Sequence, residues 1–383
     1  MKTCPVPQAN PLILYLSGYY REKLGETGAN DYARASRLST LYVFPSTSDE
    51  KSALEAALRS NPADATAHYL LGTWCYARSK TSDALREWKT AQQSGARIPA
   101  LEASLGLALL HDMHDFSGAS GAFQKGITND PKNIENYFGA VGAMTLLGAS
   151  AADRVRILER YPNLKEMPNP LVYELALNRS ESGDYEGAAS LFQNRFFGRE
   201  EGGTNVRQVW IEVRLQQAAG LAKAGNCQAA LPVADHLGEP VPRLDFTADG
   251  LAPFVESSRT NYILGEVYAV CGKGDKADAH FLQASKANGA TEILWAWAAS
   301  KKLKNYDDKI WQERLSAAAS RAEKHLSSAG SRQSWSLYMS GVLSLAAGNA
   351  TQGNEHLRQV FLFPDAGLSH HLARLALAGA TPR

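Results

Sequence analysis

Hydrophobic positions in this chain recur in blocks with helical spacing, and small residues recur inside those blocks at a fixed interval. The stretch YLLGTWCY, residues 69–76, places Gly72 inside an apolar helical segment. A glycine there costs about 1 kcal/mol relative to alanine. Gly106 follows 34 residues later, again after a leucine, and Gly265 stands in the same frame. A costly residue that recurs in this way indicates a place where two helix backbones pack closely.

The second half of each block continues the alternation of small and bulky residues. Further along the first block, the matching small and bulky positions are Ala84, Trp88 and Ala91. In the block that contains Gly265 they are Ala277, Phe281 and Ala284. Large side chains beside small ones at matched positions are typical of two antiparallel helices that nest against each other. Each block is therefore predicted to be a helical hairpin.

A period of 34 residues with this pattern resembles the tetratricopeptide repeat (TPR). The best copies are 65–98, 99–131 and 258–287; the looser ones are 11–44, 132–162, 169–196, 211–237, 291–327 and 334–364, with a closing helix at 368–379. No segment alternates like a strand over a useful length. The sequence thus predicts an all-α fold, a TPR-like α-solenoid of about eight hairpins in a right-handed superhelix.

Two connections interrupt the repeats and suggest the domain organisation. We expect an extended segment at 1–10, repeats at 11–192, a Glu-Gly-Gly loop at 193–210, and further repeats at 211–383 that carry a loop insertion at 237–257. Long connections in a compact array are more often functional than idle.

Several short phrases are similar to the C-terminal TPR portion of long bacterial proteins that carry an N-terminal β-rich domain of unknown function. The phrases are Asn10-Pro11-Leu12 with Tyr15, Gly18-Tyr19-Tyr20, Val43-Phe44-Pro45-Ser46, and Arg195-Phe196-Phe197 followed by Glu201-Gly202-Gly203. In that family the β-rich domain is loosely linked with carbohydrate enzymes. No such domain is seen in this sequence, so we expect either a segment of a longer protein or a relative that stands alone. The resemblance carries over no catalytic function.

Charge and hydropathy narrow the class of partner. The 383 residues have a formal net charge of +1 and are 44% hydrophobic. This balance argues against nucleic acid, whose binders usually show a basic stripe. No apolar run reaches the roughly 18 residues of a membrane span, and the first residues lack the apolar core of a signal peptide. We therefore predict a cytoplasmic protein that binds neither nucleic acid nor membrane.

The four cysteines are Cys4, Cys75, Cys227 and Cys271, and all are far apart in sequence. None forms the C-x-x-C pair that would favour a zinc or redox site. Free thiols in a reducing compartment are the simpler interpretation, and a disulfide is not expected.

A TPR array typically presents the first helix of each repeat on its concave face. That frame predicts a partner-binding set there, made of Tyr15, Tyr69, Thr73, Tyr76, Tyr173, Arg259, Tyr262, Glu266, Trp335 and Tyr338. Aromatic rings with polar tips suit a peptide groove or sugar stacking. Packing inside the repeat explains the tyrosines equally well, so both interpretations stay open.

The acidic residues of the Glu-Gly-Gly loop at 193–210 raise the question of catalysis. Glu200 and Glu201, with Asp245 and Asp249, could form the carboxylate pair of a glycoside hydrolase. Alternatively, the loop that contains Gly202 and Gly203 makes a turn that faces water, or it contacts a partner domain.

The cluster His111-Asp112-Met113-His114-Asp115 has ligand types suited to a divalent metal. It falls at the turn of a repeat, where polar residues are normally solvated, and we predict no metal site and no cofactor. The function predicted from the sequence is a non-catalytic interaction scaffold. Its partner would be a protein or peptide, or a β-rich domain of the same or a neighbouring polypeptide. The alternative is a carbohydrate-active or carbohydrate-binding helical protein.

Overall fold

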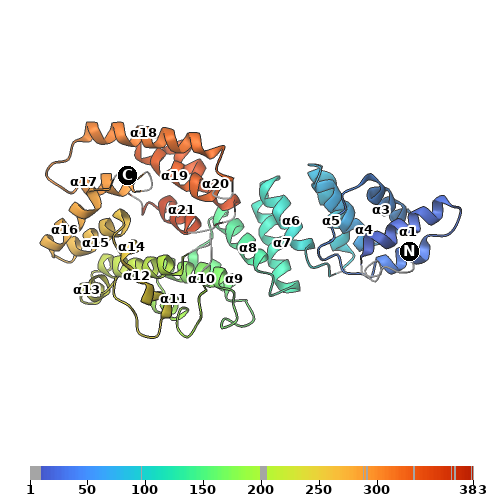
Figure 1. Ribbon diagram of the computed structural model, residues 1–383, viewed down its shortest axis with the longest axis horizontal. Coiled ribbons are helices and arrows are strands. Elements are labelled where there is room, and N and C mark those ends of the chain that lie inside the picture. The colour runs from blue at the N-terminus through green and yellow to red at the C-terminus, as the bar shows by residue number, and fades with distance from the viewer. Residues whose placement is uncertain are drawn as a thin grey trace. The chain divides into compact units, whose positions relative to one another are not determined.

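The computed structural model describes residues 10–95, 97–198, 205–287, 289, 292–330, 333–363, 365, 368–380 and 382. These described residues form helices and no strand, which confirms the predicted all-α class (Figure 1). The chain divides into two compact units, unit 1 up to Leu147 and unit 2 from Gly148. This boundary lies inside the predicted repeat segment 11–192.

Unit 1 is a series of short helices joined by tight turns. In chain order they are α1 (Pro11–Lys23), α2 (Ala29–Ala35), α3 (Ser48–Ser60), α4 (Ala65–Tyr76), α5 (Thr81–Gln93), α6 (Leu101–His111), α7 (Phe116–Asn129) and α8 (Ile134–Leu146). Helices adjacent in sequence pack together, as in the hairpins α4–α5 and α6–α7. The repeat pattern did not predict α3. Its start carries a capping box between Thr47 and Glu50, which is a recognisable signal of a helix N-terminus.

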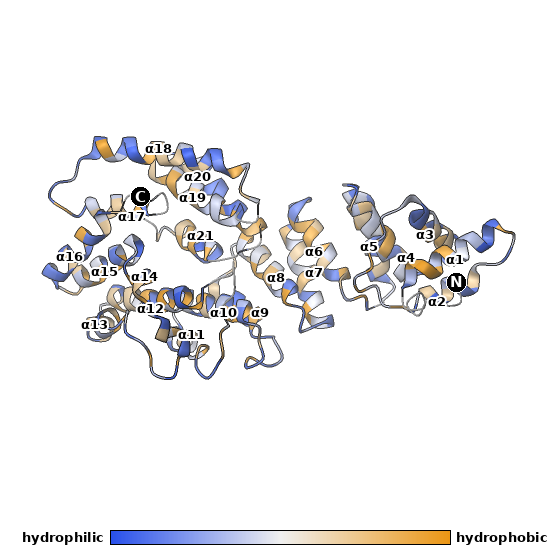
Figure 2. Ribbon diagram, viewed as in Figure 1, coloured by the Kyte–Doolittle hydropathy of each residue, from blue (hydrophilic) through white to orange (hydrophobic). Residues whose placement is uncertain are grey.

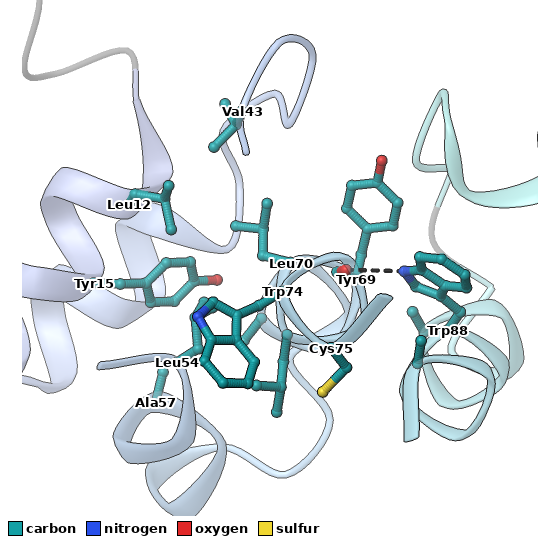
Figure 3. Close-up of a cluster of buried hydrophobic side chains, with 14 of the residues drawn as sticks. Leu12, Tyr15, Val43, Leu54, Ala57, Tyr69, Leu70, Trp74, Cys75 and Trp88 are labelled. Carbon is teal, nitrogen blue, oxygen red and sulfur yellow. Dashed lines mark hydrogen bonds between the residues drawn. The ribbon is translucent and has the colours of Figure 1, made fainter. Parts of the chain in front are cut away.

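The hairpin α4–α5 shows what the recurring glycine does. A Cβ at Gly72 would lie 2.5 Å from Cδ1 of Trp88, so only glycine allows the indole ring to lie against this helix. Trp88 Nε1 donates a hydrogen bond to the carbonyl oxygen of Tyr69 at 3.1 Å (Figure 3). Gly106 faces Phe123 in the same way in α6–α7, where a Cβ would lie 2.6 Å from the ring. The predicted close packing of small against bulky residues is confirmed.

Unit 2 contains the same pairing of small and bulky residues, in helices of more varied length. Its helices are α9 (Ala151–Leu158), α10 (Asn169–Glu181), α11 (Tyr185–Ser190), α12 (Val206–Lys223), α13 (Cys227–Asp235), α14 (Ala252–Val255), α15 (Ser258–Val270), α16 (Gly274–Ser285), α17 (Ile293–Ser300), α18 (Asp308–Leu326), α19 (Gln333–Ala346), α20 (Ala350–Gln359) and α21 (Ser369–Leu377), with 3₁₀ turns η1 (Asp245–Asp249) and η3 (Val360–Leu362). Gly265 of α15 lies against Phe281 of α16, and Gly341 of α19 lies against Leu357 of α20. These hairpins give the chain a TPR-like helical repeat fold, and the right-handed superhelix stays a prediction.

The irregular segments predicted from the sequence contain helical elements among their described residues. The predicted loop 193–210 overlaps α12, which begins at Val206. The predicted insertion 237–257 contains η1 and α14, and both pack on α12.

Helix α18 packs on α19, and Figure 2 shows both hydrophobic and hydrophilic segments along it, as expected for a helix with one covered face.

One expectation about the cysteines is wrong. Cys227, at the start of α13, and Cys271, just after α15, form a disulfide with their Cα atoms 5.4 Å apart. Their separation of 44 positions in the sequence concealed this pairing, because spacing along the chain does not show which helix ends meet. Cys75 is a buried free thiol, as expected.

Candidate functional site

The clearest candidate site is a cluster of buried charges in unit 2. Helix α10 carries Glu174 and Glu181, which are seven residues, or about two turns, apart and therefore on one face. Helix α12 adds Glu212. We call these three residues the acidic cluster; each is less than a tenth exposed. Buried carboxylates are costly unless cations pair with them, so the neighbouring cations decide what this surface can hold.

Helix α21 supplies two of those cations. Asp365 accepts hydrogen bonds from the backbone N–H groups of Ser369 and His370, which fixes the start of the helix. His371 and Arg374 follow at a spacing of three, so both point to one side. In Figure 1, α21 lies between the α19–α20 hairpin and the helices α10 and α12, more than 150 residues earlier in the chain.

His371 lies directly between two carboxylates. Its Nδ1 is 2.7 Å from Oε1 of Glu181, and its Nε2 is 2.9 Å from Oε1 of Glu212. Only the protonated imidazolium can donate from both ring nitrogens at once. Burial opposes that charge, but the hydrogen bonds and charges of the two glutamates outweigh burial and raise the pKa of His371.

Arg374 extends the contact along α10. Its Nε donates to both carboxylate oxygens of Glu181, at 2.9 and 3.1 Å, and its Nη1 lies 3.2 Å from Oε1 of Glu174. Both terminal nitrogens are buried, and neither makes a hydrogen bond to the described residues. Arg374 therefore has the right charge for this surface but leaves part of its hydrogen-bonding capacity unused.

Two further arginines hold the carboxylates in place. Arg154 of α9 pairs with Glu181 at 2.6 Å, and Arg259 of α15 binds Glu212 with both terminal nitrogens. Burial raises the pKa of Glu181, but the charges of Arg374, His371 and Arg154 outweigh it and lower that pKa to about 2. The acidic cluster is thus ionised at neutral pH.

We use the name inner face for the surface of α10, α12, α15 and α19 that carries the acidic cluster, Arg259 and Tyr338. Of the residues predicted from the sequence, Arg259 and Tyr338 lie on this face. Sequence reasoning missed the glutamates and both cations of α21. A usable signal was present, since Glu174 and Asn178 stand among apolar residues that are otherwise buried all round α10.

The residues predicted in unit 2 are mostly engaged within the chain. Tyr173 is 4% exposed and stacks on Phe197, and Tyr338 is 3% exposed. Tyr262 packs between the rings of Phe281 and Trp295. Arg259 pairs with Glu212, and Glu266 pairs with Lys302. Trp335 lies beside Tyr338. Partner binding by this set stays a prediction, and packing accounts for the buried tyrosines.

The residues predicted in unit 1 form a separate group. Tyr15 is fully buried and donates to Asp64 at 2.9 Å. Tyr69, which Figure 3 shows in the same hydrophobic cluster as Tyr15, is also buried. Thr73 donates to the carbonyl oxygen of Tyr69, while Tyr76 lies against the Trp88 ring. Only Thr73 and Tyr76 keep appreciable exposed surface, so a partner on this unit would meet those two.

The Glu-Gly-Gly loop cannot be placed relative to Asp245 and Asp249. Glu200, Glu201, Gly202 and Gly203 lie outside the described residues, so their prediction stays open. Asp245 and Asp249 are exposed at the ends of η1. Described residues of the two irregular segments do meet, because the rings of Phe197 and Phe246 are 5.6 Å apart.

A serine, a histidine and a glutamate also meet at α18–α20, and their order is not that of a hydrolase. Ser340 Oγ donates to Glu323 at 3.0 Å and lies 3.1 Å from Nδ1 of His356. In a catalytic triad the histidine joins the serine to the acid, whereas here the serine is the middle member. Ser340 is also fully buried, so no substrate can reach it.

In the part of the chain that the structure describes, no three His, Cys, Asp or Glu residues come together in an arrangement that could hold a metal ion. His111, in the motif noted above, lies at the end of α6, where burial lowers its pKa. Its neighbour Asp112 forms a hydrogen bond with Tyr76 instead.

The solved structures that are similar to this chain are distant from it. No family model matches the chain, and no curated protein matches it. A tetratricopeptide repeat protein from Parabacteroides merdae has a similar solved structure, with 13% identity over 80% of this chain and 97% of that one, at a TM-score of 0.33. The C-terminal part of a TPR repeat-containing protein from Cytophaga hutchinsonii shares 15% identity over 70% of this chain and 93% of that one, at 0.39.

A third structure, Naa15/Naa10 bound to HypK-THB, is 13% identical over 92% of this chain and 63% of that one, with a TM-score of 0.36. These likenesses are distant. The class of this protein, an all-α TPR-like helical repeat, follows from the glycine-to-aromatic hairpins described above. Among the described helices, none is both long and apolar enough to cross a membrane.

Proposed function

We propose that this chain is a non-catalytic scaffold that binds a segment of a partner protein on the inner face of unit 2. One observation carries the proposal. The inner face already holds a helix, α21, through buried ion pairs to residues more than 150 positions away. A surface that binds one helix through complementary charges and apolar contacts has what it needs to bind another.

The chemistry of the site fits binding better than catalysis. The glutamates of the acidic cluster are each neutralised by a buried cation, and the pKa of each is lowered. A general acid needs the opposite, a carboxyl group whose pKa is raised towards neutrality. We therefore infer a protein or peptide partner, and no nucleic acid, cofactor or membrane.

The disulfide bears on the cellular compartment of the protein. The cytoplasmic location stays a prediction, and the Cys227–Cys271 disulfide argues against it. Disulfides persist mainly in oxidising compartments. The partner would then be sought among proteins that share such a compartment.

Site-specific photo-crosslinking in the native cell tests the scaffold role. A photoreactive amino acid at Trp335, which is partly exposed beside the inner face, should crosslink to one discrete protein. The matched control is the same amino acid at Leu282 of α16, which is 51% exposed and belongs to the second helix of its hairpin. Identical crosslinked products from both positions, or none from either, would contradict the proposal.

A further inference from the structure

We propose that α21 is a displaceable occupant of the inner face, and that the partner of this face is an amphipathic helix presenting two cations three residues apart. This inference rests on the proposed scaffold role and adds the chemistry of the partner. It is drawn from the charges, the contacts and the unused hydrogen bonds of the cluster around His371 and Arg374.

The charge balance of the site demands a cationic occupant. When α21 is set aside, the three carboxylates of the acidic cluster face only two guanidinium groups, those of Arg154 and Arg259. All three carboxylates are less than a tenth exposed. An uncompensated buried charge is strongly unfavourable, so a neutral or acidic segment would not replace α21.

The positions of the carboxylates set the spacing of the incoming cations. Glu181 pairs with both His371 and Arg374. Glu212 pairs with His371, and Glu174 pairs with Arg374. Residues at i and i+3 lie on one side of a helix, which brings two cations to this row of carboxylates together. An arginine in place of His371 would also suit the site, because its planar fork can donate to two acceptors.

The apolar side of α21 defines the rest of the partner. Leu372, Ala373 and Ala376 are buried, and α21 packs against α19 and α20. The spacing of Leu372 and Ala376 is one helical turn. A competing helix therefore needs small or aliphatic residues on the edge next to its cations.

Two observations make α21 replaceable rather than a fixed part of the core. The helix has nine residues, which is too short to be stable without its contacts. Neither terminal nitrogen of Arg374 makes a hydrogen bond to the described residues, although Nη1 lies 3.2 Å from Oε1 of Glu174. An arginine placed slightly differently on a partner helix could make those bonds and so bind more tightly than α21 does.

A labelled peptide with the sequence of residues 368–380 is the probe. It is titrated against the full-length wild-type chain and against the full-length double variant His371→Ala/Arg374→Ala, whose own α21 lacks the cations. We expect the peptide to bind the double variant at least about tenfold more tightly than wild type, because the internal competitor is weakened. A control peptide with both cations replaced by alanine should bind neither chain. Equal affinity for the two chains, or equal binding of the control peptide, would overturn the proposal.

Hydrogen exchange on the wild-type chain covers the case in which the double variant does not fold. Amides of α21 should exchange through a local opening, while amides of α12 and α19 stay protected. Equal protection of α21 and these helices would show that α21 never leaves by itself. A crosslink from Trp335 with no peptide binding would leave the scaffold role standing and refute only the inference about α21.

Discussion

Gly72 and Gly121 both lie inside helices of unit 1, yet their surroundings differ completely. A Cβ at Gly72 would meet Trp88 at 2.5 Å, whereas a Cβ at Gly121 would meet nothing within 4 Å. At the scale of single residues, the same amino acid is thus required at one position and only tolerated at the other. Helix propensity favours alanine at both, so packing alone separates them.

The substitution Gly72→Ala should therefore destabilise unit 1. We expect a loss of about 1–3 kcal/mol in the free energy of unfolding, because the new methyl group must push Trp88 aside. Gly121→Ala is the matched control and should be neutral or stabilising by up to about 1 kcal/mol. Urea denaturation followed by tryptophan fluorescence measures both. Equal effects of the two substitutions would refute the packing argument.

His371 makes the site sensitive to pH. It faces Glu181 of α10 and Glu212 of α12, with Arg374 beside it on α21. The other charged or titratable groups nearby are Glu174, Arg154, Arg259, His370 and Tyr338. Because the folded-state pKa of His371 is raised above 6.5, its stabilising effect is fully present below 6.5 and is lost as pH rises through the folded value.

Unit 2 should accordingly lose stability as pH rises from about 6.5 through the raised pKa of His371, and the variant His371→Gln should lose less over the same range. The acidic limit has the opposite sign. Folding lowers the pKa of Glu181 from 4.5 to about 2, so the stabilising contribution of this carboxylate is fully present above pH 4.5 and is lost as pH falls from there through about 2. Urea unfolding at several pH values measures the difference. His236→Gln, at an exposed position, is the control. Parallel profiles for wild type and His371→Gln would show that His371 is not responsible.

At the scale of elements, the hairpins were predictable and their long-range partners were not. Gly72 and Trp88 are 16 residues apart and recur with the repeat, so a periodic pattern exposes their contact. Glu181 and His371 are 190 residues apart, and nothing local marks them as a pair. The sequence indicated a closing helix at 368–379 but could not show which face it covers. The same reason explains why the disulfide was missed.

The disulfide joins the start of α13 to the end of α15 and should stabilise unit 2. Closing a loop of 44 residues is worth about 2–4 kcal/mol, chiefly by restricting the unfolded chain. Adding dithiothreitol should lower the melting temperature of the wild-type chain, measured by circular dichroism. The variant Cys227→Ser/Cys271→Ser should melt at that lower temperature with or without the reductant. A wild-type melting temperature that ignores reductant would count against the bond.

At the scale of the whole molecule, the chain consists of two compact units with different cores. The packing around Gly72 belongs to unit 1, and the disulfide and the acidic cluster belong to unit 2. Sites that share no contacting residues usually contribute independently to stability. The combination of Gly72→Ala with Cys227→Ser/Cys271→Ser should therefore lose the sum of the separate losses, within about 0.5 kcal/mol. A deviation well beyond that, in urea unfolding, would reveal coupling between the units.

The bond between Cys227 and Cys271 also bears on how the chain would survive proteolytic damage. In the sequence, the connection that contains Pro240, Pro242 and the exposed Arg243 lies between the two cysteines. If a protease cuts there, the two fragments remain covalently attached. Nicked molecules would run as one full-length band on a gel without thiol and separate into two only when thiol is added.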